Sequence, residues 1–429
     1  MTTRDDIIAQ LPPQGLFREP GIPWRISPEP LRLPRALVRR LEGLGHVLAC
    51  FQDAAHELYL RSVDGREAPW LAPLLDAGKP EWLVRAQRRY RRKAGPALIR
   101  PDLLWCEDGP ALAEIDSVPG GAGLTLFLSR VYARRGFPVL GGADGILEGF
   151  RRAHPGGARI AVSEESADYR PEMAYLSDAL GDAYPCGDAE TLPESLPEGS
   201  CLYRFFELFD TAAIPPARAL IEAASQGAFR MSPPPVAHLE EKVWLALFHY
   251  PGLRSYWQRA LRGAHLECLR RIIPYGWIVD PAPLPPQAAL PRLNLNSWSE
   301  VAELSQKQRR LVLKISGFDE RAWGAHGVVI GHDVSAAQWA EALRSALDEY
   351  PHKLRLMQEF RETRLIEHPY LEHDGSIRLM RGRVRLCPYY FRDPDGRTSL
   401  SGCLATIVPE DKKKIHGMRE AILVPCQES

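Results

Sequence analysis

Two short stretches of the sequence bring carboxylates and an arginine together at regular spacing. Asp102 follows Arg100 by two residues, and Asp116 follows Glu114 at the same spacing. Side chains two residues apart on a strand point to the same face, and a turn at 107–109 would bring Asp102 beside that face. Carboxylates gathered in this way repel one another unless a cation lies between them, and oxygen ligands suit Mg²⁺ that carries nucleotide phosphates. The spacing therefore indicates metal ligands, although an ordinary hairpin with exposed acids remains the alternative.

A second candidate group surrounds Lys314. This lysine ends an apolar stretch and is followed by a polar loop that contains Gly317, Gly324 and Gly327. Its ammonium and the backbone N–H groups of such a loop can hold phosphates, although a glycine-bearing hairpin explains the pattern equally well. The segment does not fit GxxxxGK[ST] or a strand–GxGxxG–helix, so neither a P-loop nor a Rossmann site is supported.

A third candidate group lies at the end of a predicted strand, where Gln358 and Glu359 stand between Met357 and Phe360. A backbone amide and carbonyl flanked by apolar residues can read the edge of an adenine. We therefore expect Gln358 and Glu359 at the adenine edge of a nucleotide.

The hydrophobic pattern predicts the elements that would position these groups. Apolar residues recur at helical spacing within 34–60, and 82–92 is a basic amphipathic segment. The pattern then changes to two strands, in 97–109 and 110–121, followed by a helix over about 123–135, a strand in 158–166 and a helix from about Pro171. This alternation is typical of an α/β protein.

Three consecutive prolines at 233–235 mark a boundary, because they cannot lie inside a helix. Beyond them we expect a helix over 239–248, a basic helix around 254–271, a loop at 281–296, strands on both sides of the glycine loop, a helix over 336–349 and a β-rich tail. The predicted domains are a mainly helical region at 1–95, a metal-binding hairpin with an α/β substrate-side domain at 96–232, and nucleotide-binding subdomains at 233–429.

Composition limits the class of protein. A chain of 429 residues suggests two or three domains, and 45% hydrophobic with 25% charged residues is typical of a soluble globular protein. Lys+Arg and Asp+Glu both number 54, which excludes a global basic field for nucleic acid. The eight cysteines include no CxxC pair, and no apolar window is long enough to cross a membrane. With no secretory pattern at the start, we expect a cytoplasmic protein with reduced thiols.

Taken in order, these groups resemble the circularly permuted branch of the ATP-grasp superfamily, typified by the synthetase domain of glutathionylspermidine synthase. That branch carries a magnesium-binding pattern of Arg-x-Asp, eleven residues and Glu-x-Asn, placed before the ATP-binding lysines. Here Arg100-x-Asp102 is followed by eleven residues and Glu114-x-Asp116. Asp116 stands where the family pattern has Asn, so it keeps an oxygen ligand and adds a negative charge. The resemblance implies an α/β (α+β) ATP-grasp fold, circularly permuted, with a helical N-terminal region.

The resemblance also implies roles for residues further along the chain. A lysine that opens a helix ending in an aromatic-Pro turn corresponds to Lys242, which would contact the nucleotide. The strand and phosphate-covering loop of the family correspond to Lys314, Gly324 and Gly327, and the adenine hinge corresponds to MQEF. The interval between the two lysines is longer than in the type member, which implies an insertion across 254–300.

The activity implied is that of an ATP-dependent carboxylate–amine ligase, which forms an acyl-phosphate with Mg-ATP and lets an amine displace the phosphate. Asp102, Glu114 and Asp116 would bind the metal, and Arg100 would grip the substrate carboxylate or the acyl-phosphate. Arg378 is a secondary candidate for phosphate contact, whereas the alternating arginines at 381, 383 and 385 could equally form a solvated face. An ATP-dependent phosphotransferase and an inactive nucleotide-binding scaffold are the alternatives.

The cofactors expected are therefore ATP and Mg²⁺. The partners expected are small carboxylate and amine substrates such as an amino acid, a peptide or a polyamine, with neither nucleic acid nor membrane. The sequence leaves the substrates and the oligomeric state open.

Overall fold

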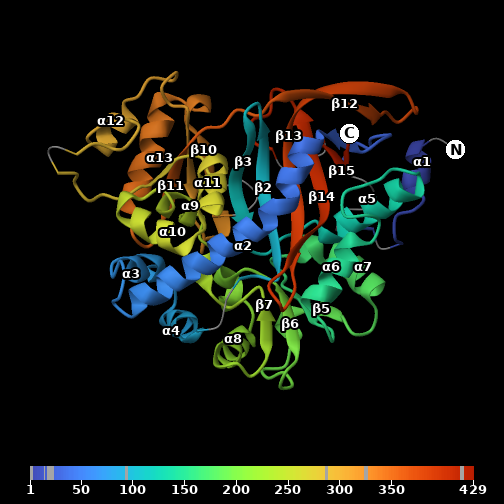
Figure 1. Ribbon diagram of the computed structural model, residues 1–429, viewed down its shortest axis with the longest axis horizontal. Helices are drawn as coiled ribbons and strands as arrows, with labels where there is room; N and C mark the ends of the chain where they lie inside the picture. Colours follow the sequence, from blue (N-terminus) through green and yellow to red (C-terminus); the bar gives the residue numbers. More distant parts are fainter. Residues whose placement is uncertain are drawn as a thin grey trace. The chain divides into compact units, whose positions relative to one another are not determined.

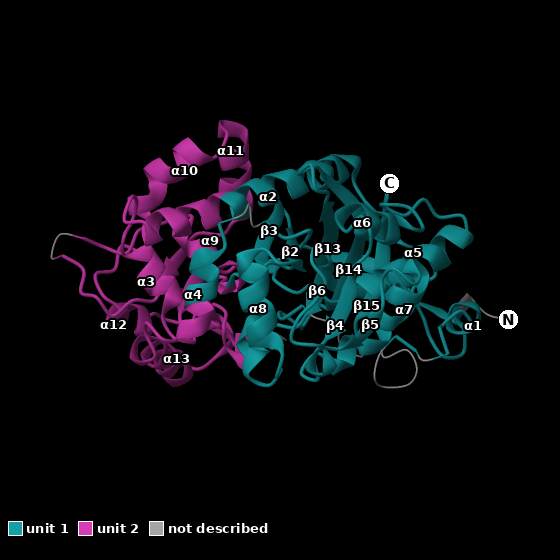
Figure 2. Ribbon diagram, turned by 90° about the horizontal axis from the view of Figure 1, so that it is seen from below, with its two compact units in different colours: residues 1–53, 85–236, 362–429 teal, residues 54–84, 237–361 magenta. Residues whose placement is uncertain are grey.

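The computed structural model describes residues 3–13, 15–16, 24–91, 95–285, 288–322, 327–415 and 420–429. The chain forms two compact units, which are coloured separately in Figure 2. Unit 1 contains 1–53, 85–236 and 362–429, and unit 2 contains 54–84 and 237–361. Both units combine helices with β-sheet (Figure 1), so the predicted mixed α/β class is confirmed.

The main sheet of unit 1 has seven strands among the described residues. Their order is β1-β15-β14-β13-β2-β3, and β12 also pairs with β13. The strands are β1 (Leu31–Leu33), β2 (Leu98–Cys106), β3 (Gly109–Asp116), β12 (Leu365–Leu371), β13 (Ile377–Arg392), β14 (Thr398–Pro409) and β15 (Ile422–Glu428). Helices α5 (Ala122–Arg134) and α6 (Gly145–Ala153) pack against β13, β14 and β15.

A second sheet of unit 1 is parallel and has the order β5-β4-β6-β7. Its strands are β4 (Arg159–Val162), β5 (Cys186–Asp188), β6 (Cys201–Phe205) and β7 (Arg230–Ser232), and its helices are α7 (Arg170–Leu180) and α8 (Ala217–Gln226). The predicted strand within 158–166 and the helix near Pro171 are thereby confirmed.

Most of the described residues among the first 95 lie in helices. This region contains α1 (Thr3–Ile8), β1, α2 (Arg35–Val63), α3 (Leu71–Asp76) and α4 (Glu81–Arg89). The apolar positions that predict α2, among them Leu41, Leu48 and Phe51, are all buried. The boundary between the two units falls inside both α2 and α4.

Unit 2 is built around an antiparallel sheet of order β10-β9-β11-β8. Its strands are β8 (Gly276–Ile278), β9 (Leu311–Ile315), β10 (Val328–Ile330) and β11 (Arg355–Glu359). Helix α13 (Ala336–Asp348) begins with a capping box formed by Ser335 and Gln338, and its Trp339 is fully buried in one core with Leu313 and Met357. Unit 2 also contains α3, α9 (Trp244–Leu247), α10 (Arg254–Ala260), α11 (Gly263–Ile272) and α12 (Trp298–Ala302).

Two predicted helices of unit 2 differ from the structure. The helix expected over 239–248 is reduced to α9, because the backbone N–H groups of Lys242 and Val243 donate to Ser316 instead of to helical carbonyls. The helix expected around 254–271 is broken into α10 and α11 at Leu261, which adopts extended backbone and buries its side chain.

The segment 254–300, expected to be an insertion, contributes α10, α11 and α12 but also β8, an edge strand of the unit 2 sheet. The domain boundary predicted at 232 lies four residues before Val236, where unit 1 gives way to unit 2. The predicted domain boundaries stay predictions. None of the helices formed by the described residues is both long and apolar enough to cross a membrane.

Candidate functional site

The acidic face predicted on the β2–β3 hairpin is formed by cross-strand neighbours. Asp102 lies opposite Glu114, and Arg100 lies opposite Asp116. Directly opposed residues of an antiparallel pair point to the same face, and so do residues two apart on one strand. The hairpin therefore gathers three carboxylates and one guanidinium on a single face, as the sequence predicts.

Asp102 is buried, with 3% of the residue exposed, so it does not match the alternative of a hairpin with exposed acids. A buried carboxylate needs partners, and those of Asp102 include two guanidiniums and a thiol. Its Oδ2 accepts from Nη1 of Arg385 at 2.6 Å, and its Oδ1 lies 3.2 Å from Nη2 of Arg100. The Cys387 thiol donates to Oδ1 at 3.3 Å, and burial raises the pKa of this thiol to about 12, so it stays protonated.

Arg100 joins three parts of the site. Its guanidinium contacts Asp116 and Asp102 and donates to the carbonyl of Gly120 at 3.0 Å. The second oxygen of Asp116 accepts from the N–H of Val118 at 3.1 Å. Arg100 thus acts as a cation between two acids, and its predicted grip on a substrate carboxylate stays a prediction.

The loop 117–123, which follows Asp116, is held in place by side chains from several elements. Tyr389 of β13 donates to the Gly120 carbonyl at 2.7 Å, and Ser117 donates to Glu207 at 2.9 Å. Buried Glu172 of α7 accepts from the N–H of Gly121 at 2.6 Å. Gly121 has a φ of +82°, and a Cβ there would lie 2.7 Å from the Tyr389 hydroxyl, so only glycine fits.

Glu172 carries the clearest perturbed carboxyl of this region. It also accepts from the N–H of Leu124 at 3.1 Å, near the start of α5. Burial raises its pKa to about 7, and the two backbone N–H groups only partly oppose that rise. Glu172 therefore changes charge close to neutral pH while it holds the loop beside the acidic face.

The oxygen donors of this hairpin face are of the kind that a hard divalent cation prefers. Asp102, Glu114 and Asp116 offer only oxygen atoms, all on one face of the hairpin. Two guanidiniums, from Arg100 and Arg385, already balance part of that charge. Among the described residues, these three carboxylates do not form a group whose ligand atoms all lie within 4.8 Å of one another, so their role as metal ligands stays a prediction.

Unit 2 carries the two predicted phosphate-binding lysines. Lys314 lies on β9, and its ammonium donates to Oε1 of Gln358 on β11 at 3.0 Å. Lys242 lies in the turn before α9, and its ammonium donates to the carbonyl of Ala322 at 2.7 Å. Ser316 connects the two segments, since its carbonyl accepts from the N–H of Lys242 at 2.9 Å. Unit 2 thus joins the backbones of both lysine segments through one serine.

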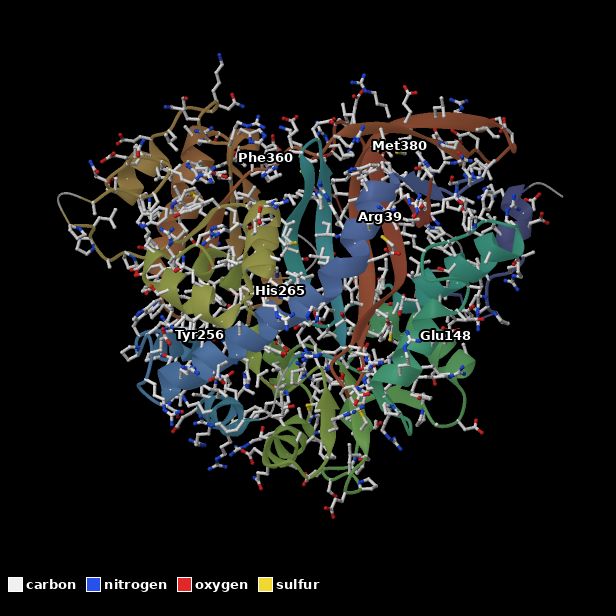
Figure 3. All side chains as sticks on the ribbon, in the orientation of Figure 1. Arg39, Glu148, Tyr256, His265, Phe360 and Met380 are labelled. Carbon is white, nitrogen blue, oxygen red and sulfur yellow. The ribbon has the colours of Figure 1, made fainter. Side chains whose placement is uncertain are left out.

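The predicted adenine hinge divides into two faces. Gln358 is buried and turns toward Lys314, whereas Glu359 forms an ion pair with Arg292 at 2.8 Å. The N–H of Glu359 donates to the carbonyl of Tyr275, and that of Phe360, which is labelled in Figure 3, donates to the carbonyl of Arg310, both at 2.9 Å. Both N–H groups are therefore already used within unit 2, and the role of the hinge stays a prediction.

A cavity of about 460 Å³ lies in unit 2 beside this strand. Tyr275, whose carbonyl pairs with Glu359, is one of the residues that line it. Most of its wall is aromatic or basic, and the lining residues are Phe248, His249, Tyr250, Pro251, Arg254, Trp257, Leu266, Arg270 and Tyr275. Burial and nearby arginines lower the pKa of His249 to about 4, so its ring is neutral at physiological pH.

The remaining predicted residues are placed as follows. Gly327 lies where the glycine loop rejoins β10, and its carbonyl accepts from the N–H of Ile315 at 3.2 Å. Gly324 lies outside the described residues. Arg378 is exposed, 3.5 Å from Glu372. Seven residues along β13 separate it from Arg385, roughly 20 Å in an extended strand, so the structure does not bring it to the acidic face.

Three residues of these groups were missed or misjudged by sequence reasoning. The sequence leaves open whether Arg385 belongs to a solvated face, and in the structure its side chain is 19% exposed and paired with buried Asp102. Only the pairing of β13 with β2 reveals this contact, and that pairing joins residues almost 300 positions apart. Glu172 and Ser316 carry no motif that would single them out.

Comparisons with known proteins show the fold. No family model matches this sequence, and no curated protein matches it. A solved structure of a glutathione synthetase-like effector from Globodera pallida, in apo form, aligns with a TM-score of 0.59 and 11% identity, over 100% of this chain and 96% of that one. A putative γ-glutamylcysteine synthetase from Methylobacillus flagellatus aligns with a TM-score of only 0.37 and 12% identity, over 86% of this chain and 84% of that one, which is too low to support an argument. The chain thus shares the fold of the glutathione synthetase-like effector.

Proposed function

We propose that this protein is an ATP-dependent carboxylate–amine ligase. The observation that carries the proposal is the register of the β2–β3 hairpin, which puts Asp102 opposite Glu114 and Arg100 opposite Asp116. In this register, the three carboxylates that the sequence spacing singles out lie on one face of the hairpin. Lys314 on the sheet of unit 2, Lys242 in the turn before α9, and the fold shared with a glutathione synthetase-like effector support the same proposal.

The residues of unit 1 would bind Mg²⁺ and orient the carboxylate substrate. Bound Mg²⁺ would neutralise phosphate charge and favour phosphoryl transfer. Arg100, fixed by Asp116, Asp102 and the Gly120 carbonyl, would present its guanidinium beside the loop 117–123. Such a fixed cation suits a carboxylate or an acyl-phosphate, because it needs no reorganisation when charge develops.

The residues of unit 2 would bind the nucleotide. Lys242 and Lys314 would exchange their present contacts with the Ala322 carbonyl and the Gln358 amide for phosphate oxygens. The cavity lined by Tyr275, Trp257 and other rings lies beside the hinge strand and would suit the planar adenine. Because the metal-binding hairpin precedes both lysines in the chain, we also propose the circularly permuted order of the ATP-grasp elements.

The proposed reaction has two steps. The substrate carboxylate attacks the γ-phosphorus of ATP and gives an acyl-phosphate and ADP. An amine then attacks the acyl carbon, the C–O bond to phosphate breaks, and the amide, inorganic phosphate and a proton leave. The protein would contribute positioning and electrostatics rather than a covalent group. An amino acid or a peptide would supply the carboxylate, and an amino acid, a peptide or a polyamine would supply the amine.

Nucleotide binding is the first test. A ligand that binds only the folded state at about 100 times its dissociation constant adds roughly 2.7 kcal/mol to the free energy of unfolding. We therefore expect millimolar ATP to raise the melting temperature with Mg²⁺ and to raise it much less with EDTA. An unchanged melting temperature with Mg-ATP and Mg-ADP would contradict the proposed ligase. It would also contradict the alternatives of a phosphotransferase and an inactive nucleotide-binding scaffold.

A further inference from the structure

A buried ion pair in unit 2 joins Lys79 to Glu241, the residue that precedes Lys242. The segment around Lys79 has no role in the proposed function. Nζ of Lys79 lies 2.5 Å from Oε1 of Glu241, and the two side chains are 1% and 3% exposed. Two charges removed from water in this way are retained only with good geometry and further hydrogen bonds. Lys79 is therefore too enclosed to touch a ligand and must act through Glu241.

Tight packing fixes the place of Lys79. The preceding residue, Gly78, has a φ of +75°, and a Cβ there would lie 2.0 Å from the carbonyl oxygen of His352. Only glycine allows this approach. The segment that follows α3 is thereby held against the residues before β11, with the ammonium of Lys79 directed at Glu241.

Glu241 connects Lys79 to Ser316. Its Oε2 accepts from the Ser316 hydroxyl, and that hydroxyl accepts from the N–H of Val243 at 2.9 Å. The Ser316 carbonyl accepts from the N–H of Lys242, and the Ser316 N–H donates to the carbonyl of Leu354, both at 2.9 Å. The hydroxyl and the carbonyl of Ser316 thus tie the turn 241–243 to the end of β9.

This arrangement fixes the two lysines relative to each other. Ser316 follows Lys314 by two residues, and Glu241 immediately precedes Lys242. Two ammonium groups can share one polyphosphate without an entropic penalty only if their backbones are already held at the required separation. Ser316 connects those backbones directly, and Glu241 links it to Lys79; the side chains of all three residues are buried.

We propose that Lys79 is a positioning residue for nucleotide binding, which acts through Glu241 and Ser316 to hold the Lys242 and Lys314 segments together. The inference rests on the proposed function of the two lysines. It gives the region between α3 and α4 a role in the nucleotide site, although Lys79 itself would touch no nucleotide.

The test compares Mg-ATP affinity with stability in matched variants. Isothermal titration would measure the dissociation constant of Mg-ATP for the full chain, well below the melting temperature of each variant. Lys307→Met is the control, because Lys307 is an exposed lysine of the same unit outside this network. We expect Lys79→Met to weaken Mg-ATP binding at least tenfold relative to Lys307→Met.

A double variant separates positioning from stability. Replacing both partners of a buried ion pair by apolar residues removes the uncompensated charge and is often neutral for stability. Lys79→Met/Glu241→Met should therefore recover the melting temperature lost in Lys79→Met but not the affinity. Should Lys79→Met fail to fold, Ser316→Ala decides the matter. It removes the hydroxyl that links Glu241 to the N–H of Val243, leaves Glu241 paired with Lys79, and should weaken binding at least fivefold.

The outcomes are distinct. Wild-type protein that does not bind Mg-ATP would contradict the proposed function itself. Wild-type protein that binds, together with Ser316→Ala and the double variant binding as tightly as Lys307→Met, would overturn the positioning role of Lys79 and leave the proposed function intact.

Discussion

Arg100 lies directly opposite Asp116 across the β2–β3 hairpin, and its guanidinium contacts both that carboxylate and the carboxylate of Asp102. Arg385 contacts Asp102 as well, so two guanidiniums meet the acids of this face. We propose that such a face takes up a cation that arrives with phosphate, rather than holding an isolated metal tightly.

Glu114 is the acid whose removal tests the metal site most cleanly. Glu114→Gln keeps the volume of the side chain and removes one charge, so we expect Mg-ATP-dependent phosphate release to fall by about 10²-fold or more with little change in melting temperature. The control is Glu107→Gln at the exposed turn of the same hairpin. Equal phosphate release by the two variants would mean that the acidic face binds no catalytic metal.

Lys314 should contribute mainly to nucleotide affinity. Hydrogen bonds to charged groups are worth about 1.5–3 kcal/mol, so Lys314→Met should raise the dissociation constant of Mg-ATP by about tenfold or more. Titration calorimetry against Lys307→Met would measure the difference. If the affinity is unchanged while turnover is lost, Lys314 acts on the reacting groups instead of on the resting nucleotide.

Arg385 should be important for stability as well as for the site. Arg385→Met removes the 2.6 Å partner of buried Asp102, and breaking such a pair costs about 3 kcal/mol or more. Arg381→Met on the same strand, where the side chain is 61% exposed, should change stability by about 0.5 kcal/mol or less. Chemical denaturation of both variants would show the contrast, and equal effects would contradict the assignment of Arg385 to the buried network.

Titration of Glu172 makes the free energy of unfolding depend on pH, and this contribution falls as the pH rises. Its folded pKa of about 7 lies above the ordinary value of 4.5, so between these values the folded state binds a proton that the unfolded state has released. Stability from this group is therefore present below pH 4.5 and lost as the pH rises toward 7.

Glu172→Gln keeps an acceptor for the N–H groups of Gly121 and Leu124 but does not titrate. We expect the stability of the variant relative to wild type to increase from pH 5 to pH 7.5 by on the order of 1–3 kcal/mol. Denaturation midpoints at both pH values would measure it, and a constant difference would show that the carboxyl does not titrate in this range.

The sequence predicted the elements whose signals are local. The helical periodicity around Leu41 and Phe51, the turn between β2 and β3, and the alternation of Glu114 with Asp116 all appear in the structure as expected. These features depend on contacts within a few residues, which the sequence pattern records directly.

The features that the sequence could not supply depend on long-range pairing. Arg385 meets Asp102 only because β13 pairs with β2, and the helix expected over 239–248 is shortened because Ser316 takes the N–H groups of Lys242 and Val243. Neither contact can be predicted from the local hydrophobic spacing. The buried Lys79–Glu241 pair is hidden for the same reason, since a lysine before a proline reads as a solvated turn.

The most direct test of the ligase proposal is a phosphate-release screen of the purified chain with Mg-ATP over paired amino acids, small peptides and polyamines. We predict phosphate and ADP in equal amounts for at least one pair, only when both the carboxylate and the amine are present, and not in Glu114→Gln. ADP formed with a stable phosphorylated product and no need for an amine would contradict the proposal and identify a phosphotransferase.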